Sequence, residues 1–121
     1  AFSYVDDSIL PFWNASQKNS CIGEIINLGG IKEHTINDAC NVLINVTGQN
    51  LKPVHLEARH ETKYAWSTWE KSVKLLDFKH QVDLEEGLSK MWEWAQKQPN
   101  RERFIWPKYE LNKGIYEYWK N

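Results

Sequence analysis

The segment 54–78 most constrains what this 121-residue chain can fold into. Apolar and polar side chains alternate through residues 54–58, which is the period of a strand with one buried face. The next five residues, 59–63, have the sequence Arg-His-Glu-Thr-Lys. None of them has an apolar side chain. Ser67 then stands three residues before Glu70, a spacing typical of the capping box at the start of a helix. The segment therefore predicts a strand, a polar tip and a helix that runs to about residue 77.

The polar tip, residues 59–63, has the chemistry of an anion site. Arg59 offers a planar fork of donors that matches phosphate, and the ammonium group of Lys63 adds positive charge nearby. The structural alternative for Arg59 is a surface salt bridge to Glu57 or Glu61, which contributes about 0–1 kcal/mol. The alternative for Lys63 is a solvated surface position. The tip is therefore a candidate for binding a phosphate-bearing ligand.

Elsewhere the sequence predicts one more strand and three more helices. Residues 24–28 form the strand, and Gly29 and Gly30 end it by allowing a sharp turn. Pro11 is tolerable only in the first turn of a helix, because it lacks an N–H. For the first helix, two adjacent aspartates are interpreted as capping groups rather than as a paired acid–base site. The helices are expected to begin at Asp6 or Asp7, at Thr35 with Asp38, and at Asp83 with Glu86, and to end near Lys18, Gly48 and Pro99.

The alternation of short strands with helices predicts a small, helix-rich α/β domain in which helices pack around a short sheet. The length indicates a single domain over residues 1–121. Residues 99–121 form a polar linker and an aromatic tail, in which Gly114 weakens an otherwise helical spacing. The seven tryptophans of the chain could build a core, a docking face or a surface that stacks on sugars.

Charge and composition narrow the classes of function. The net charge is −1, so no overall field attracts nucleic acid or anionic membranes. No apolar run approaches the ~18 residues that span a bilayer, and no secretory signal opens the sequence, so a cytoplasmic protein is expected. Cys21 and Cys40 are then expected to be reduced thiols, with one disulfide between them as the alternative. A zinc site among the histidines and glutamates of residues 55–61 is not expected, because no HExxH or paired CxxC spacing occurs.

Three stretches carry a resemblance to a known family. Residues 2–7 read Phe-Ser-Tyr-Val-Asp-Asp, residues 25–30 read Ile-Ile-Asn-Leu-Gly-Gly with Thr-Ile-Asn-Asp at 35–38, and residues 57–65 read Glu-Ala-Arg-His-Glu-Thr-Lys-Tyr-Ala. In this order they resemble motifs of the NAD-dependent nucleotide-sugar epimerases and dehydratases, extended short-chain dehydrogenases such as UDP-glucose 4-epimerase. The resemblance covers residues 1–98 and implies the C-terminal, substrate-binding portion of such an enzyme.

By this resemblance, Arg59 would contact the nucleotide diphosphate, Glu61 the ribose hydroxyls, and Lys63 would add positive charge. The family binds NAD on a Gly-rich turn, and no G-x-G-x-x-G or similar pattern occurs in this sequence. Tyr109 and Lys113 have the spacing of the family's catalytic Tyr-x-x-x-Lys pair. They follow every matched motif, so we interpret the spacing as coincidence and assign no catalytic, cofactor-binding or metal-binding residue to the chain.

The resemblance further implies partners. Alone, the chain is expected neither to bind NAD nor to catalyse, although the full-length family uses NAD. Its ligand would be a nucleotide sugar of the UDP type, and its protein partner either the missing NAD-binding Rossmann half or further copies of the chain. The competing hypothesis is a stand-alone protein-interaction or carbohydrate-binding module that uses exposed aromatic side chains.

Overall fold

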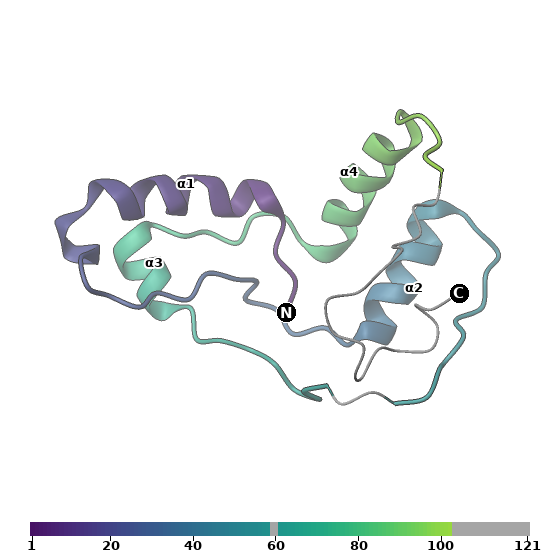
Figure 1. Cartoon of the computed structure of the whole chain (residues 1–121), viewed down its shortest axis with the longest axis horizontal. Coiled ribbons are helices and arrows are strands. Elements are labelled where there is room, and N and C mark those ends of the chain that lie inside the picture. Colours follow the sequence, from purple (N-terminus) through teal and green to yellow (C-terminus); the bar gives the residue numbers. More distant parts are fainter. Residues whose placement is uncertain (59–60, 103–121) are drawn as a thin grey trace.

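The computed structural model describes residues 1–58 and 61–102 (Figure 1). Regular structure in this part of the chain is helical throughout. The elements are α1 (Val5–Gln17), a short 3-10 helix (Asn19–Cys21), α2 (Ile36–Thr47), α3 (Glu70–Leu76) and α4 (Leu84–Gln96).

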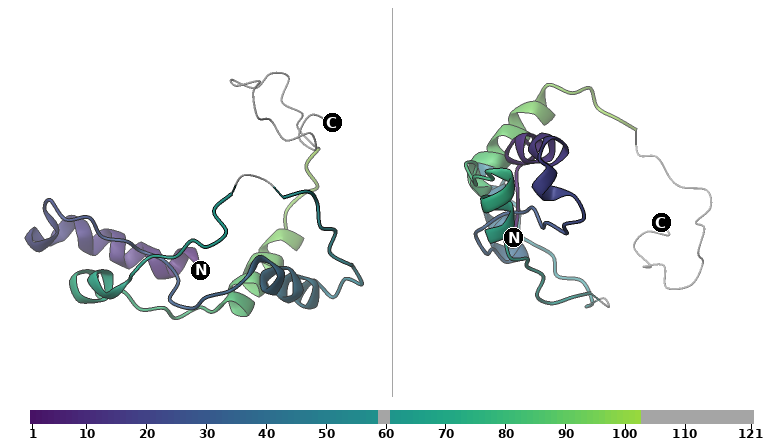
Figure 2. Two further views of the ribbon diagram at one scale, coloured as in Figure 1. Left: turned by 90° about the horizontal axis from the view of Figure 1, so that it is seen from below. Right: turned by 90° about the vertical axis from the view of Figure 1, so that its left-hand side faces the viewer.

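The helices pack as two pairs. α1 packs with α3, and α2 packs with α4, so each helix is paired with one that is not its neighbour in sequence. Figures 1 and 2 show the two pairs side by side, with the N-terminal segment between them. Long segments without regular structure connect the pairs. The one before residues 59–60 runs around the outside of α2, and the one after them leads along the lower edge to α3 (Figure 1).

The expected α/β fold is wrong, because the described residues contain no strand. Residues 24–28 and 54–58 have no regular secondary structure. Ile25 is 85% exposed and Val54 is 81% exposed, whereas Ile26 and Leu28 are half-buried. A strand is held by backbone hydrogen bonds to a neighbouring strand, and neither segment has such a neighbour within the described residues. The alternation of residue types at 54–58 predicted a half-buried strand, and this prediction is wrong.

Helix α1 begins earlier than expected and includes its proline. The N-cap is Tyr4, so Asp6 and Asp7 both lie within the first turn rather than at the cap. Pro11 lies in the helix interior, beyond the first turn to which the sequence analysis confined it. Because proline has no N–H, it cannot bond the carbonyl of Asp7, and α1 tolerates this loss in a position where the Pro11 ring is buried.

The capping predictions for α2 and α4 are confirmed. The Asp38 N–H donates to Thr35 Oγ1 over 3.0 Å and the Thr35 N–H donates to Asp38 Oδ2 over 2.8 Å, which completes the capping box of α2. The pKa of the Asp38 carboxyl is held below its usual range, mainly by the hydrogen bond from the Thr35 backbone and then by the one to the Thr35 side chain. Gly48 ends α2 in the left-handed conformation, with φ of 64°. Asp83 Oδ1 accepts the Glu86 N–H over 2.9 Å at the start of α4.

The capping box expected at Ser67 is wrong. α3 begins at Glu70, and its N-cap residue is Trp69, whose side chain makes no capping bond. The helix is only two turns long, and its other end is held by α1. Asn14 Nδ2 donates to the carbonyl of Leu76 over 2.8 Å, and Lys18 Nζ donates to the carbonyl of Leu75 over 2.9 Å. Side chains of α1 and of its C-cap residue therefore satisfy two of the carbonyls that the C-terminus of α3 leaves open.

A buried carboxylate joins the two helix pairs. Asp7 is 6% exposed, and its Oδ2 accepts the backbone N–H groups of Gln81 and Val82 over 3.0 and 3.1 Å. These residues belong to the segment that leads from α3 into α4. The apolar side chains almost fully buried within the described residues are Leu76, Phe78 and Val82, which lie in the same stretch. The centre of the structure is therefore the contact between α1 and residues 76–82.

Candidate functional site

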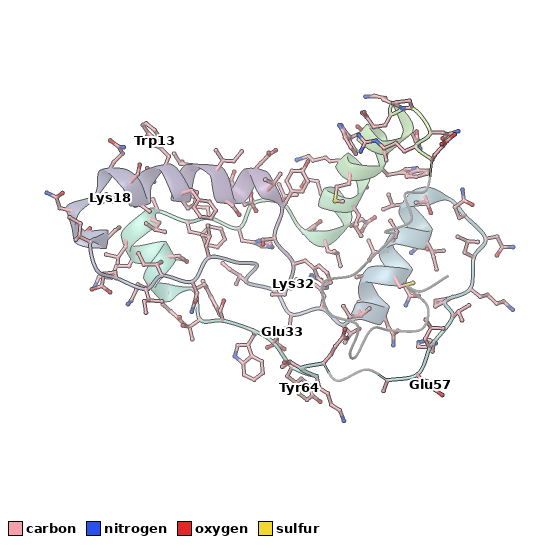
Figure 3. All side chains as sticks on the ribbon, viewed as in Figure 1. Trp13, Lys18, Lys32, Glu33, Glu57 and Tyr64 are labelled. Carbon is pink, nitrogen blue, oxygen red and sulfur yellow. The ribbon has the colours of Figure 1, made fainter. Side chains whose placement is uncertain are left out.

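The candidate binding residues lie on the long connection between α2 and α3. Arg59, the residue with the most specific predicted role, lies outside the described residues. Glu61 and Lys63 are described and exposed. Tyr64 is 79% exposed, and Figure 3 shows it and Glu57 projecting from the lower edge of the molecule, away from the helices. The structure thus places the described part of the polar tip on an open surface.

Contacts to the rest of the chain hold the connection on both sides of the tip. Before it, His55 Nε2 lies 3.2 Å from Asn37 Oδ1 in the first turn of α2. After it, Lys71 in α3 donates from Nζ to Glu24 Oε2 over 2.8 Å and to the carbonyl of Ile25 over 3.1 Å. The hydrogen bond from Lys71 holds the pKa of the Glu24 carboxyl below its usual range. These contacts fix where the polar tip starts and ends relative to α2 and α3.

Sequence reasoning did not identify these anchoring residues. His55 was considered only as part of a zinc site, and Lys71 was assigned no contact. The position of Asn37 in the first turn of the predicted helix and the polar character of His55 were visible in the sequence. Their pairing was not, because it depends on the path of the backbone between residues 48 and 55.

The polar tip lines neither of the two cavities described next. A pocket of about 90 Å³ lies between the N-terminal segment and α4, and its walls include Tyr4, Leu88 and Met91. A groove of about 220 Å³ lies between α1 and the segment after it, next to Cys21 and Leu28. Pockets for drug-sized ligands hold about 300–1,000 Å³, so neither cavity is large enough to enclose a nucleotide sugar.

Other chemistry considered for the sequence finds no support in the described part of the chain. Cys21 and Cys40 are free thiols. Within residues 1–58 and 61–102, no group of three or more His, Cys, Asp or Glu side chains is arranged to hold a metal ion. None of the helices in these ranges is long and apolar enough to cross a bilayer. The Tyr109–Lys113 spacing lies outside the described residues.

Comparison with known proteins identifies relatives of this chain. No protein-family profile matches the sequence. The UDP-glucuronate 4-epimerase of Thermodesulfobacterium geofontis (strain OPF15) is 35% identical over 98 residues, which are 78% of this chain and 29% of that enzyme. A point mutant of UDP-glucuronic acid 4-epimerase from Bacillus cereus, solved with UDP-4-deoxy-4-fluoro-glucuronic acid and NAD, matches with a TM-score of 0.72. It shares 30% sequence identity, and the match covers 79% of this chain and 31% of that one.

A second structure of the Bacillus cereus enzyme, solved with NAD, agrees. It matches with a TM-score of 0.67 and 29% identity, over 79% of this chain and 30% of the enzyme. The resemblance to the NAD-dependent nucleotide-sugar epimerases is therefore confirmed. Within these epimerases, the relatives found act on UDP-glucuronate, whereas the sequence motifs had suggested UDP-glucose 4-epimerase as the example.

The epimerase relatives are much longer than this chain. The chain spans about three-tenths of the length of each of them. The chain is nevertheless similar in structure to part of the epimerase: the match has a TM-score of 0.72 and covers 79% of the chain. This similarity is one of backbone structure, and it is found although the described residues lack the expected sheet.

Proposed function

We propose that this chain forms the nucleotide-sugar-binding portion of an NAD-dependent epimerase that acts on UDP-glucuronic acid or a closely related UDP-sugar. The observation that carries the proposal is the structural match to an epimerase solved with UDP-4-deoxy-4-fluoro-glucuronic acid and NAD. The sequence adds an arginine and a lysine at the polar tip, 59–63, where a diphosphate can be bound. The exposed position of Lys63 and the contacts that hold the connection on both sides are consistent with a ligand-binding loop.

NAD would be bound by another part of the enzyme. Two observations support this division: the chain spans about three-tenths of its relatives, and its sequence contains no Gly-rich dinucleotide turn. In such an enzyme, NAD supplies the hydride acceptor. Residues 59–63 would hold the UDP moiety and so fix the position of the sugar relative to the nicotinamide. The contribution of this chain to the reaction is then the orientation of the substrate.

The outer face of α1 has the character of a surface that binds another protein segment, such as the NAD-binding part of the enzyme. Val5, Ile9, Phe12 and Trp13 fall on one side of the helix and are all more than half exposed. Figure 3 shows Trp13 pointing away from α3. A contiguous apolar helix face of this type marks an interaction surface. We propose that the NAD-binding part of the enzyme covers this face, and a second copy of the chain is the alternative.

The binding role of Arg59 can be tested by titration calorimetry with UDP-glucuronic acid. Replacing Arg59 with alanine removes charge-assisted hydrogen bonds to phosphate, worth about 1.5–3 kcal/mol, so the affinity is expected to fall roughly ten- to a hundredfold. Arg101→Ala is the matched control, because it removes an exposed arginine elsewhere in the chain and is expected to leave the affinity unchanged. Equal affinities for the Arg59 and Arg101 variants would exclude Arg59 from the site.

The same titration distinguishes the competing carbohydrate-binding module. Trp66 is two-thirds exposed and close in sequence to the tip, which favours sugar stacking as the second candidate function. A carbohydrate module would bind free glucuronic acid as well as the UDP-sugar and would lose both in Trp66→Ala. The nucleotide-sugar proposal expects UDP alone to compete with UDP-glucuronic acid, and free glucuronic acid not to compete.

The proposed division of labour predicts that the 121-residue chain has no epimerase activity of its own. With NAD and UDP-glucuronic acid added, formation of the 4-epimer is expected to stay at the buffer background, because no Gly-rich turn is present to hold the hydride acceptor. Chromatography of the UDP-sugars after overnight incubation measures this. Turnover by a pure sample that scales with protein concentration would show that the chain is a complete catalyst.

A further inference from the structure

We infer that Lys71 is a positioning residue for the proposed nucleotide-sugar site. Its bonds to Glu24 and to the carbonyl of Ile25 hold the chain that leaves the polar tip, and this order raises the affinity for the UDP-sugar. Lys71 acts through the tip and does not itself bind the ligand. The inference rests on the proposed function for the identity of the ligand, whereas its structural part concerns described residues alone.

The chain between the polar tip and α3 runs beside the segment that follows the 3-10 helix. Lys71 Nζ donates to Glu24 Oε2 over 2.8 Å and to the carbonyl of Ile25 over 3.1 Å. Four residues before Lys71, Ser67 Oγ lies 3.9 Å from the position that a Cβ on Gly29 would occupy. Both contacts are made to one segment, so the position of that segment sets the path of the chain that leaves the tip.

Residues 24–29 are themselves held by the rest of the structure. Ile26 and Leu28 are half-buried, and both line the groove beside α1. At the end of this segment, the backbone of Gly30 lies against that of Phe2, since a Cβ on Gly30 would overlap the Phe2 carbonyl. Lys71 therefore links the chain after the tip to a segment that α1 and the N-terminal segment both support.

This link matters for binding because the tip has little other support. Residues 61–68 are exposed and have no helix or strand. A ligand that binds a loosely held loop must also order it, and this lowers the affinity. Lys71 lies in the first turn of α3, eight positions after Lys63, so it holds the tip from outside the predicted ligand contacts. The side chains of the ion pair are 49% and 44% exposed, so its removal costs little stability.

Lys18 provides a matched control, because it makes the same kind of contact at the other end of α3. Its Nζ donates to the carbonyl of Leu75 and to a carboxylate oxygen of Asp77. Each of the two lysines thus bonds one carboxylate and one backbone carbonyl, and both are partly exposed. Figure 3 shows Lys18 at the end of α1, away from Tyr64 and the lower edge of the molecule. Lys18→Met therefore removes an equivalent contact that does not support the tip.

Titration calorimetry of the 121-residue chain with UDP-glucuronic acid tests the effect on binding. Lys71→Met is expected to weaken binding roughly three- to tenfold, because the ligand must then order the tip. Lys71→Arg keeps donors for both acceptors and is expected to restore most of the affinity, and Lys18→Met is expected to leave it unchanged. An unchanged affinity in Lys71→Met would overturn the inference, as would an equal loss in Lys18→Met.

Glu24→Ala separates positioning from direct contact with the ligand. If Lys71 acts by positioning, loss of its carboxylate partner is expected to weaken binding about two- to fivefold, and the double variant to bind no worse than Lys71→Met alone. If Lys71 bound the diphosphate itself, Glu24→Ala would release its ammonium group for the ligand. Stronger binding by Glu24→Ala would therefore overturn the inference.

Tryptic cleavage after Lys63 tests the structural part without any ligand. Lys63 is exposed, and cleavage there requires the chain around it to open locally. Relative to cleavage after Lys97 in the same sample, the rate is expected to rise about threefold or more in Lys71→Met and to stay unchanged in Lys18→Met. Equal rates in the wild-type chain and Lys71→Met would overturn the inference. A wild-type chain that does not bind UDP-glucuronic acid would instead refute the proposed function, and the cleavage rates would still decide whether Lys71 holds the tip.

Discussion

Replacing Asp7 with alanine is expected to lower the free energy of unfolding by about 3 kcal/mol, since each lost bond to a buried charged acceptor costs about 1.5–3 kcal/mol. Asp7 is 6% exposed, and its Oδ2 accepts the backbone N–H groups of both Gln81 and Val82. Alanine would leave these two donors without the acceptor that now binds them, and the Val82 bond is fully buried. The two helix pairs would lose one of the contacts that join them.

The matched control for this prediction is Asp6→Ala. Asp6 occupies the same first turn of α1 and interacts with the same helix dipole, but its side chain is exposed. Its replacement is expected to change the free energy of unfolding by about 0.5 kcal/mol. Urea unfolding followed by tryptophan fluorescence measures both variants. Equal losses for the two would mean that the helix dipole, rather than the bonds to Gln81 and Val82, accounts for the role of Asp7.

Replacing Gly30 with alanine is expected to destabilise the chain by about 2–3 kcal/mol, the upper part of the range for overpacking. A Cβ at position 30 would lie only 1.8 Å from the carbonyl oxygen of Phe2 and 2.7 Å from its carbonyl carbon. Both are backbone atoms, so no side-chain rotation relieves the overlap. Either the N-terminal segment or the backbone at residue 30 must move, and this would disturb the start of α1.

Gly29→Ala separates this overlap from a general effect of replacing glycine. A Cβ at position 29 would meet only Ser67 Oγ, at an ordinary contact distance of 3.9 Å. Alanine there is expected to be neutral or slightly stabilising, by a few tenths of a kcal/mol, since it restricts the unfolded chain. The thermal midpoints of the two variants test the difference. A midpoint for Gly30→Ala as high as that of Gly29→Ala would contradict the close approach of Phe2.

Local signals in the sequence predicted the helix ends well. The Thr35–Asp38 box, the Gly48 stop and the Asp83 cap are each formed by residues within one turn, so spacing alone is informative. The same kind of signal was misleading at Ser67, because α3 starts only at Glu70. A capping motif permits a helix to start, but packing of the following residues decides whether it does.

Features that depend on distant residues were not predictable in this way. The two expected strands needed partners that the described residues do not provide, so alternation of residue types was insufficient. Asp7 was interpreted as a cap because its true partners, Gln81 and Val82, lie 74 and 75 positions along the chain. The candidate site was predicted from the types of its residues. The roles of Arg59, Glu61 and Lys63 remain predictions, which the titration above tests.

The alternating pairing of the helices has a consequence for how the chain reaches its folded state. α1 packs on α3, and α2 on α4, in the pairs described above. During synthesis, neither pair can therefore form until the later helix of that pair has been made. Each pairing closes a long loop, which slows folding relative to a bundle of sequential helices. Until then α2 presents an unpaired apolar side, and association with other chains competes with folding. A partner that binds the N-terminal half during synthesis would therefore raise the yield of folded protein, in addition to forming a complex with it.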